Sequence, residues 1–296
     1  MSYENPRNSP GERPGKIQLN GQEFLFVVVQ RGGNSAIYKS KDSFLRIGTK
    51  EKILADLALH KKMEAAGFPV ARVIAEGNHN GQLYFMESSL GDTHLGALFA
   101  NDVEKREVIS AEQFESFVLI TEKFARAQLT TRRDAQNYTE FAQGILLQKL
   151  SEELPEHAEG LGIRFQEVQE KTKQLPFVVT HGDFNPNNLY SKGVIDLEDS
   201  FHAPYGYDLV SAMTHINYFP DSKDYEFYAK YRFTSEQKKK YFERMDAIST
   251  KAGLPPLSRF KEDFEFCRAI WLAAKLNHIP KLQEFRYDMV IDKFLK

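Results

Sequence analysis

One short loop of this chain holds residues whose types and spacing suit phosphoryl transfer. Asp183 lies five positions before Asn188, and Asp196 follows at the end of the next predicted strand. An aspartate in such a loop can orient an acceptor hydroxyl and accept its proton. An asparagine oxygen and a second carboxylate can hold a divalent cation against nucleotide phosphates. The pattern therefore predicts metal-dependent transfer of a phosphoryl group from a nucleotide to a hydroxyl.

The same residue types are also common in turns. Asp, Asn, Pro and Gly all favour tight turns, so Asp183 and Asn188 taken singly also fit a turn without chemistry. The four matching elements between His181 and Asp208 favour the catalytic interpretation. A zinc site fits poorly, because His181 and Asp183 lack His or Cys partners at the spacing that zinc requires.

The segments on either side of the loop are predicted to present these residues at one end of a small hairpin. The apolar run from Phe177 to Thr180 is typical of a strand that enters the loop. Only Leu189 to Ile195 separates Asn188 from Asp196, with Ser191 to Gly193 as the turn. Two short strands joined by a glycine-containing turn bring both predicted metal ligands together.

Hydrophobic patterning predicts an α+β fold with a small sheet followed by a larger helical part. Residues 1–15 are rich in Pro, Gly and polar residues and are expected to form a mobile tail. Five strands and one helix should follow, with strands at 24–29, 37–39, 43–47, 73–75 and 83–86 and the helix at 51–66. Later helices are expected at 111–130, 137–152, 163–173, 235–251 and 259–278.

The loop and the order of elements together resemble the aminoglycoside phosphotransferase and choline kinase-like family, which shares its architecture with protein kinases. The resemblance covers about residues 20–280. It implies a bilobal protein kinase-like fold. The N-terminal nucleotide-binding lobe, an antiparallel sheet with one helix, would cover 16–88, and the C-terminal catalytic and substrate-binding helical lobe would cover 89–296.

The resemblance also implies roles for the residues of the loop. Asp183 would be the catalytic base, with Asn188 and Asp196 as the magnesium ligands. His181 and Asp208 would be structural supports, with Asp208 as a buried brace of the catalytic loop.

The first lobe contains a predicted cradle for the nucleotide phosphates. Gly32, Gly33 and Ser35 lie between two predicted strands, where backbone N–H groups or the Ser35 hydroxyl can donate to phosphate oxygens, although a plain hairpin uses the same residues. By resemblance, Arg46 occupies the position of a phosphate-binding lysine and Asp56 that of its acidic partner. An Arg–Asp pair preserves both charges and can be bidentate.

Three further assignments complete the predicted site. Lys50 with Glu51 is the alternative ion pair for the phosphates. The resemblance places the Glu87 carbonyl and the Ser89 N–H against the nucleotide base. Glu198 is interpreted either as a substrate contact that attracts a cationic amine or as a structural residue near the metal.

Composition limits the partners and the compartment. The formal net charge of -2 does not indicate binding to nucleic acid, which requires a basic excess. The single cysteine, Cys267, forbids an internal disulfide and is expected to be a buried thiol. No segment approaches about 20 apolar residues, so no membrane span is expected. The N-terminus lacks a secretory apolar region, and we expect a cytoplasmic protein.

The sequence thus predicts an ATP- or GTP-dependent, magnesium-requiring phosphotransferase that acts on a hydroxyl of a small molecule. Amino sugars, amino alcohols and sugars are the acceptor classes that we consider. A catalytically weak nucleotide-binding scaffold is the alternative, favoured by Arg46 and Asp56 in place of Lys and Glu. A protein kinase fits less well, because no Ala-Pro-Glu segment follows Asp196.

Overall fold

The structure divides into two compact units. The computed structural model describes residues 15–30, 33–220, 230–275 and 280–296. By their internal contacts the units are Met1–Asp92, called unit 1, and Thr93–Lys296, called unit 2. The predicted tail lies outside the described residues except for Gly15.

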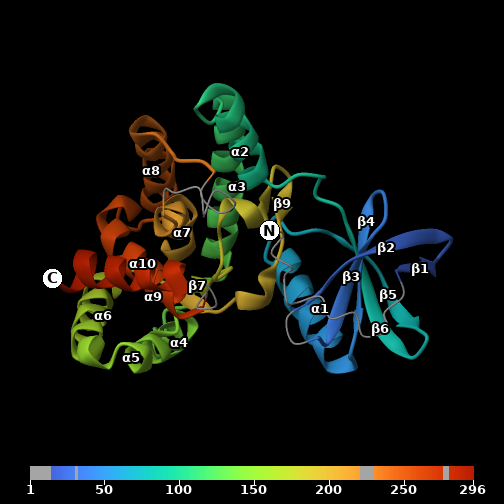
Figure 1. Cartoon of the computed structure of the whole chain (residues 1–296), viewed down its shortest axis with the longest axis horizontal. Coiled ribbons are helices and arrows are strands. Elements are labelled where there is room, and N and C mark those ends of the chain that lie inside the picture. The colour runs from blue at the N-terminus through green and yellow to red at the C-terminus, as the bar shows by residue number, and fades with distance from the viewer. Residues whose placement is uncertain (1–14, 31–32, 221–229, 276–279) are drawn as a thin grey trace. The chain divides into compact units, whose positions relative to one another are not determined.

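Unit 1 is an antiparallel sheet with one helix against it (Figure 1). Its elements are β1 (Lys16–Leu19), β2 (Gln22–Val29), β3 (Ser35–Lys39), β4 (Ser43–Gly48), α1 (Lys50–Ala65), β5 (Val73–His79) and β6 (Gln82–Ser88). The strands lie in the order β1-β2-β3-β4-β6-β5, and each neighbouring pair is antiparallel.

The sheet has six strands, so the expectation of five was wrong. The extra strand β1 is joined to β2 by Asn20 and Gly21, whose φ angles are 51° and 78°. Asn80 and Gly81 join β5 to β6 in the same way, with φ angles of 51° and 83°. Two consecutive residues with positive φ are typical of the tight hairpin turn that Asn-Gly sequences favour.

The two faces of the sheet bury different side chains. One face carries a core cluster that includes Phe24, Tyr38 and Leu45. On the other face Phe85 packs against Ile53 and Leu57 of α1. Because side chains alternate along each strand, this second face also receives Arg46 and Glu87.

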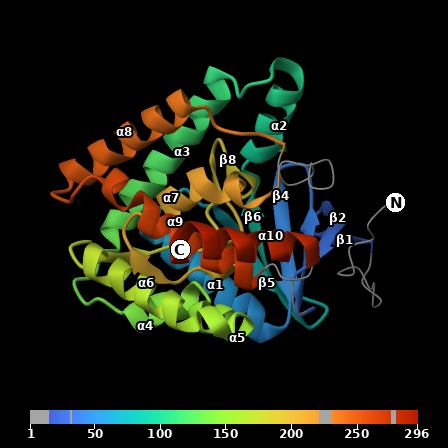
Figure 2. The same ribbon diagram turned by 60° about the vertical axis from the view of Figure 1, so that its left-hand side comes forward.

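Unit 2 is mainly helical, and α3 and α8 pack side by side in it (Figures 1 and 2). Its helices are α2 (Leu95–Arg106), α3 (Ala111–Thr130), α4 (Tyr138–Gly144), α5 (Leu147–Glu153), α6 (Ala158–Thr172), α7 (Tyr207–Thr214), α8 (Ser235–Lys251), α9 (Lys261–Lys275) and α10 (Pro280–Val290). Its strands are β7 (Phe177–Val179), β8 (Leu189–Tyr190), β9 (Gly193–Val194) and β10 (His202–Pro204).

Short 3-10 helices connect several of these elements. They are η1 (Pro155–His157), η2 (Pro186–Asn188), η3 (Leu197–Asp199), η4 (His215–Tyr218) and η6 (Leu257–Phe260). A π-helix, η7 (Ile291–Leu295), follows α10.

Some expected helices differ from the observed ones. The helix expected at 137–152 is two helices, α4 and α5, because Leu146 between them is left-handed with φ 62°. The helix expected at 259–278 is α9 preceded by η6, and residues 276–278 lie outside the described part. Helix α7 was not predicted, and all eight of its residues are buried in the structure.

Within the described ranges, no helix combines the length and the apolar character that a membrane crossing requires.

The only cysteine should be unreactive in the native protein. Cys267 is completely buried in α9, and burial raises the pKa of its thiol. Because the thiolate is the reactive form, we expect no thiol to react with a disulfide reagent in the native protein and one per chain in denaturant. The absorbance of the thiol released from the reagent measures the number of reactive cysteines per chain. A reaction of one thiol per chain in the native protein contradicts the placement of Cys267 in the core.

Candidate active site

The predicted catalytic loop follows directly after β7 in unit 2. The end of β7 is fixed because the Thr180 N–H and hydroxyl both donate to the Phe201 carbonyl, at 2.8 and 2.7 Å. Gly182 then has φ 81°, and a Cβ added there would lie 1.9 Å from the Asp199 carbonyl oxygen. Only glycine therefore permits the loop to approach η3 so closely.

Asp208 lies beneath this loop and is completely buried. Its carboxylate accepts hydrogen bonds from the backbone N–H groups of His181, at 2.7 Å, and Gly182, at 3.2 Å. Gln128 of α3 donates to the same carboxylate at 2.9 Å. Burial raises the pKa of Asp208 to about 6, and the donated hydrogen bonds limit that rise. These contacts support the predicted role of Asp208 as a brace.

His181 connects the loop to the segment that leads to Asp196. Its Nε2 lies 2.7 Å from the Ile195 carbonyl oxygen, which can only accept, so Nε2 carries a proton. Its Nδ1 accepts from the Asp183 N–H at 3.3 Å. Phe124 of α3 packs on the loop through Phe184, with ring centroids 4.3 Å apart. These contacts support the predicted structural role of His181.

Asp183 is surrounded by hydrogen-bond donors. Its Oδ1 accepts from Arg268 Nη2 at 2.5 Å and from Asn185 Nδ2 at 2.9 Å. Its Oδ2 accepts from Asn188 Nδ2 at 3.2 Å, and its side chain remains 21% exposed. Burial by itself raises the pKa of Asp183, but the charge and hydrogen bond of Arg268 outweigh it and hold the pKa well below its usual range. Asp183 is therefore a carboxylate at neutral pH.

A backbone hydrogen bond joins the segments that carry the two predicted metal ligands. The Ile195 N–H donates to the Asn188 carbonyl at 3.0 Å, where β8 pairs with β9. The Asn188 Nδ2 group donates to the carbonyl and the carboxylate of Asp183. The other end of the same amide, Asn188 Oδ1, accepts no hydrogen bond from any described residue. Asp196 is left-handed, with φ 65°, and its carboxylate also lacks a hydrogen bond or ion pair within the described ranges.

The chemistry of these oxygen donors suits a magnesium ion. Magnesium prefers oxygen ligands and takes few of them from the protein when phosphates and waters supply the rest. Among the described residues, no group of three or more His, Cys, Asp or Glu side chains has the arrangement of a metal site. The donor set of one amide and one carboxylate suits a nucleotide-bound ion better than a permanent structural one.

The acidic residues after Asp196 differ in their surroundings. Glu198 is exposed. Asp199, the next residue, is ion-paired with Lys275 of α9. Lys275 also lies over the Trp271 ring, 4.6 Å from its centroid. The charge of Asp199 is therefore neutralised within the protein.

In unit 1 the predicted phosphate loop is described in part. Gly32 lies outside the described residues, and Gly33 has φ 72°. Ser35 differs from expectation, because it is completely buried and its hydroxyl donates to Gln30 Oε1. Ser35 begins β3, where alternation places its side chain on the face opposite Ala36 and Tyr38 of the core cluster, and its hydroxyl proton is already donated to Gln30.

The expected ion pair between Arg46 and Asp56 is wrong. Arg46 Nε contacts Glu87 Oε1 at 3.1 Å, and Asp56 accepts from Lys52 at 2.8 Å. The order of the strands explains the first pair, because β4 lies beside β6 and the two side chains share one face. Lys52 and Asp56 are one turn apart on α1, the spacing at which helical charges meet.

Of the two groups predicted to contact the base, the Ser89 N–H differs from expectation and the Glu87 carbonyl stays a prediction. The Ser89 N–H donates to the Asp42 carbonyl at 2.9 Å, since the β4–β6 ladder continues past Ser88. Glu87 stands opposite Phe44 in the same ladder, and its carboxylate is buried between Arg46 and His60. The Ser89 N–H is therefore occupied by the sheet itself.

Sequence reasoning missed Arg268 and His215. Arg268 donates to Asp183 from a position 85 residues later, and its Nη2 lies 2.8 Å from His215 Nδ1. One signal was present in the sequence: an arginine inside the apolar run from Phe264 to Leu272. A buried charged residue requires a partner, so such an arginine marks a buried acid elsewhere.

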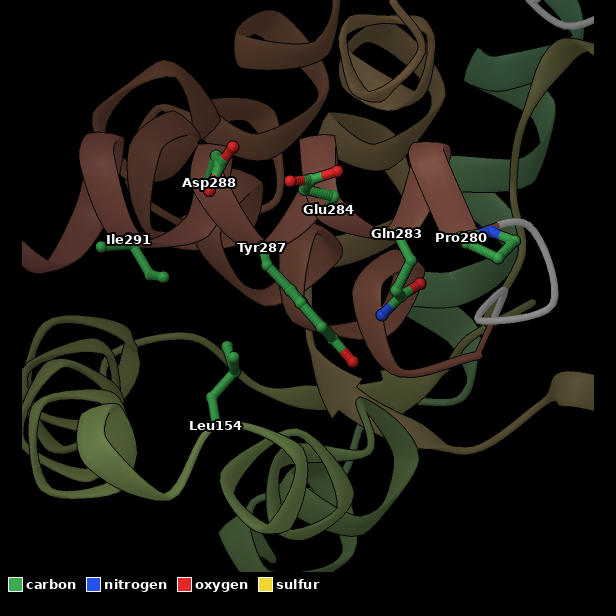
Figure 3. Close-up of a pocket in the computed structure, with 7 residues that line it drawn as sticks. All are labelled: Leu154, Pro280, Gln283, Glu284, Tyr287, Asp288 and Ile291. Atoms are coloured by element: carbon green, nitrogen blue, oxygen red, sulfur yellow. The ribbon is translucent and has the colours of Figure 1, made fainter.

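A hollow lies elsewhere in unit 2, and Figure 3 shows the side chains that surround it. It is lined by Leu154, Pro280, Gln283, Glu284, Tyr287, Asp288 and Ile291. The Tyr287 hydroxyl donates to Glu153 at 2.8 Å. None of the predicted catalytic or metal-binding residues lines this hollow.

Comparisons with known proteins bear on the family and the fold. The model of the family described as "Phosphotransferase enzyme family" matches residues 17–248. No curated protein sequence matches the chain significantly.

Three solved structures resemble the chain at low sequence identity. An aminoglycoside-3'-phosphotransferase of type VIII has 15% identity and a TM-score of 0.50, with 88% of this chain and 95% of that chain covered. A choline/ethanolamine kinase family protein from Mesorhizobium loti has 12% identity and a TM-score of 0.50, with 96% and 88% covered. A thermostable mutant of aminoglycoside phosphotransferase APH(4)-Ia, in ternary complex with AMP-PNP and hygromycin B, has 13% identity and a TM-score of 0.50, with 90% and 92% covered. The predicted α+β, protein kinase-like fold is confirmed.

The close approach at Gly182 gives a test of the loop geometry. We expect Gly182→Ala to lower the free energy of unfolding by about 2–5 kcal/mol, since a methyl group collides with the Asp199 carbonyl and the backbone is left-handed. Urea unfolding measures the change.

Gly253→Ala is the matched control. Gly253 has φ 76°, and a Cβ added there meets no atom within 4 Å. Gly253→Ala should therefore lower the free energy of unfolding only by the cost of a left-handed alanine backbone, about 1–2 kcal/mol. Equal losses in the two variants contradict the described contact between the loop and η3.

Proposed function

Because the chain belongs to the phosphotransferase enzyme family, we propose that it transfers the γ-phosphoryl group of ATP or GTP to a hydroxyl of a small molecule, with magnesium. The observation that carries this proposal is the Asp183 carboxylate held by Arg268 and Asn188, together with the Asn188 Oδ1 and the Asp196 carboxylate that no described residue engages. The solved APH(4)-Ia complex holds AMP-PNP and hygromycin B, which supports a nucleotide co-substrate and a small-molecule acceptor here.

Asp183 would orient the acceptor hydroxyl. Arg268 and Asn185 hold its Oδ1, so Oδ2 is the oxygen with capacity to accept a further hydrogen bond. A carboxylate with a low pKa is a weak base, so it accepts the proton only as the bond from the hydroxyl oxygen to phosphorus forms. Its main contribution is therefore alignment of the hydroxyl.

Magnesium would be held by Asn188 Oδ1 and the Asp196 carboxylate. When bound, it supplies positive charge that neutralises the nucleotide phosphates. The protein contributes the β8–β9 pairing that keeps the two ligands at one end of the hairpin.

The nucleotide would meet backbone N–H groups near Gly33 and the guanidinium of Arg46 in unit 1. The Nε–H of Arg46 donates to Glu87 at 3.1 Å. Glu87 therefore orients Arg46 from within the sheet, and Asp56 supports Lys52 on α1. Arg46 is thus held on this face of the sheet by Glu87 of β6, whereas the expected partner on α1, Asp56, pairs with Lys52.

A nucleotide-binding scaffold with weak catalysis is the second candidate function. The observation that favours it is the Arg46–Glu87 pair, since an arginine held by a buried carboxylate has less freedom to follow a moving phosphoryl group. Turnover measurements separate the two functions, because nucleotide binding is common to both.

Nucleotide binding should depend on magnesium and on Asp196. We expect calorimetry to detect binding of ATP or GTP in the presence of magnesium. Asp196→Asn should weaken this binding at least about tenfold, because even the loss of a residue that only supports a metal ligand lowers metal affinity by that factor.

Asp292→Asn is the control for charge alone. Asp292 is exposed and pairs only with Lys296 among the described residues, so this variant should bind nucleotide as the wild type does. Binding of the Asp196→Asn variant at wild-type strength in magnesium contradicts the assignment of Asp196 as a ligand.

Turnover should depend on Asp183. With amino sugars, amino alcohols and sugars as acceptors, we expect Asp183→Asn to lower kcat for ADP or GDP release about 100-fold or more. The Kd for the magnesium nucleotide should change little, because Asp183 faces the acceptor. A variant that retains most of the wild-type kcat rules out Asp183 as the catalytic base, and absence of any turnover in the wild type supports the scaffold.

A further inference from the structure

Arg268 is a completely buried arginine on α9, and two of its hydrogen bonds reach the catalytic loop. Its Nη1 donates to the Gly182 carbonyl at 3.0 Å. Its Nη2 donates to Asp183 Oδ1 at 2.5 Å. One guanidinium therefore contacts both the backbone of the loop and the carboxylate that the loop presents.

Two neighbours fix the guanidinium in this orientation. His215 Nδ1 lies 2.8 Å from Arg268 Nη2, and an arginine has only donors, so Nδ1 accepts the hydrogen bond. Burial and the nearby Arg268 charge lower the pKa of His215 to about 3, which keeps this imidazole neutral. The Trp271 ring covers one face, with Arg268 Cζ 4.2 Å from its centroid.

The contacts distinguish the two oxygens of Asp183. Oδ1 accepts from both Arg268 and Asn185, whereas Oδ2 has only the longer contact of 3.2 Å from Asn188. A side-chain carboxylate otherwise rotates about its last torsion and exchanges its oxygens, since that torsion has a broad, two-fold preference. The strong contact at Oδ1 opposes this exchange.

We propose that Arg268 is the positioning residue of Asp183: it clamps Oδ1 to the Gly182 carbonyl and thereby turns Oδ2 towards the acceptor hydroxyl. The proposal rests on the proposed function and adds to it the residue that sets the direction of the base. A lysine at this position provides one compact charge and lacks the planar guanidinium. It therefore does not hold the Gly182 carbonyl oxygen and Asp183 Oδ1 in one plane.

The same face of α9 supports the segment after Asp196. Arg268, Trp271 and Lys275 are spaced i, i+3 and i+7, which places them on one side of the helix. Lys275 pairs with Asp199, the residue whose carbonyl the loop approaches at Gly182. Helix α9 therefore anchors both segments that carry the predicted base and metal ligand.

The activity test compares Arg268→Lys and Arg268→Met with the wild type. The probe is magnesium ATP or GTP with the acceptor hydroxyl that gives turnover in the screen, or with water where only hydrolysis occurs. We expect kcat to fall about 10- to 100-fold in Arg268→Lys and further in Arg268→Met, as for a misplaced catalytic group, with KM for the nucleotide within about twofold.

Arg286→Lys is the matched control for removal of a buried guanidinium. Arg286 is also completely buried, lies 4.9 Å from the Phe219 ring centroid, and donates to the carbonyls of Tyr218 and Leu272. We expect this variant to lose thermal stability as Arg268→Lys does while it retains its kcat. Equal kcat losses in the two variants, or a loss confined to the nucleotide KM, overturn the proposal.

A double-mutant cycle of melting temperatures tests the contact between Arg268 and Asp183 without an activity measurement. We expect the Tm losses of Arg268→Met and Asp183→Asn to be strongly non-additive in the double variant, because each change removes the same contact. Additive losses overturn the clamp. If the wild type shows no turnover, the proposed function fails, and a non-additive cycle still supports the hold of Arg268 on Asp183.

Discussion

The architecture of the candidate site depends on the buried carboxylate of Asp208. A buried carboxylate is tolerated only when donors surround it, and here the donors are two consecutive backbone N–H groups of the catalytic loop and a side chain of α3. Satisfying this one group therefore fixes the backbone at His181 and Gly182. The direction of Asp183, the next residue, follows from that backbone.

A second buried charge, Arg268, completes the arrangement. A carboxylate and a guanidinium that leave water together need good geometry and further hydrogen bonds to offset the loss of solvation. The Gly182 carbonyl and His215 accept such hydrogen bonds from Arg268, and the Trp271 ring covers one face of its guanidinium. The polar centre of unit 2 is thus a set of mutually dependent contacts, which makes its geometry more sharply defined than packing of apolar side chains alone would.

Local chemistry could be predicted from the sequence, and distant pairing could not. The loop from His181 to Asn188 was identified because its residue types lie within one short segment. The Arg46–Glu87 pair depends on β6 lying beside β4, a strand order that no local pattern encodes. Arg268 reaches the loop from a helix far along the chain. Strand β1 was overlooked although Asn20-Gly21 signals its hairpin directly.

Trp271 is the only tryptophan of the chain, and the cations of Arg268 and Lys275 both lie over its ring. All tryptophan fluorescence of the protein therefore originates beside the catalytic loop. The emission reports on this single region of unit 2, because unit 1 contains no tryptophan and contributes no tryptophan emission. A spectroscopist who follows unfolding or ligand titration by this signal observes the support of Asp183 and Asp199 and nothing of the sheet.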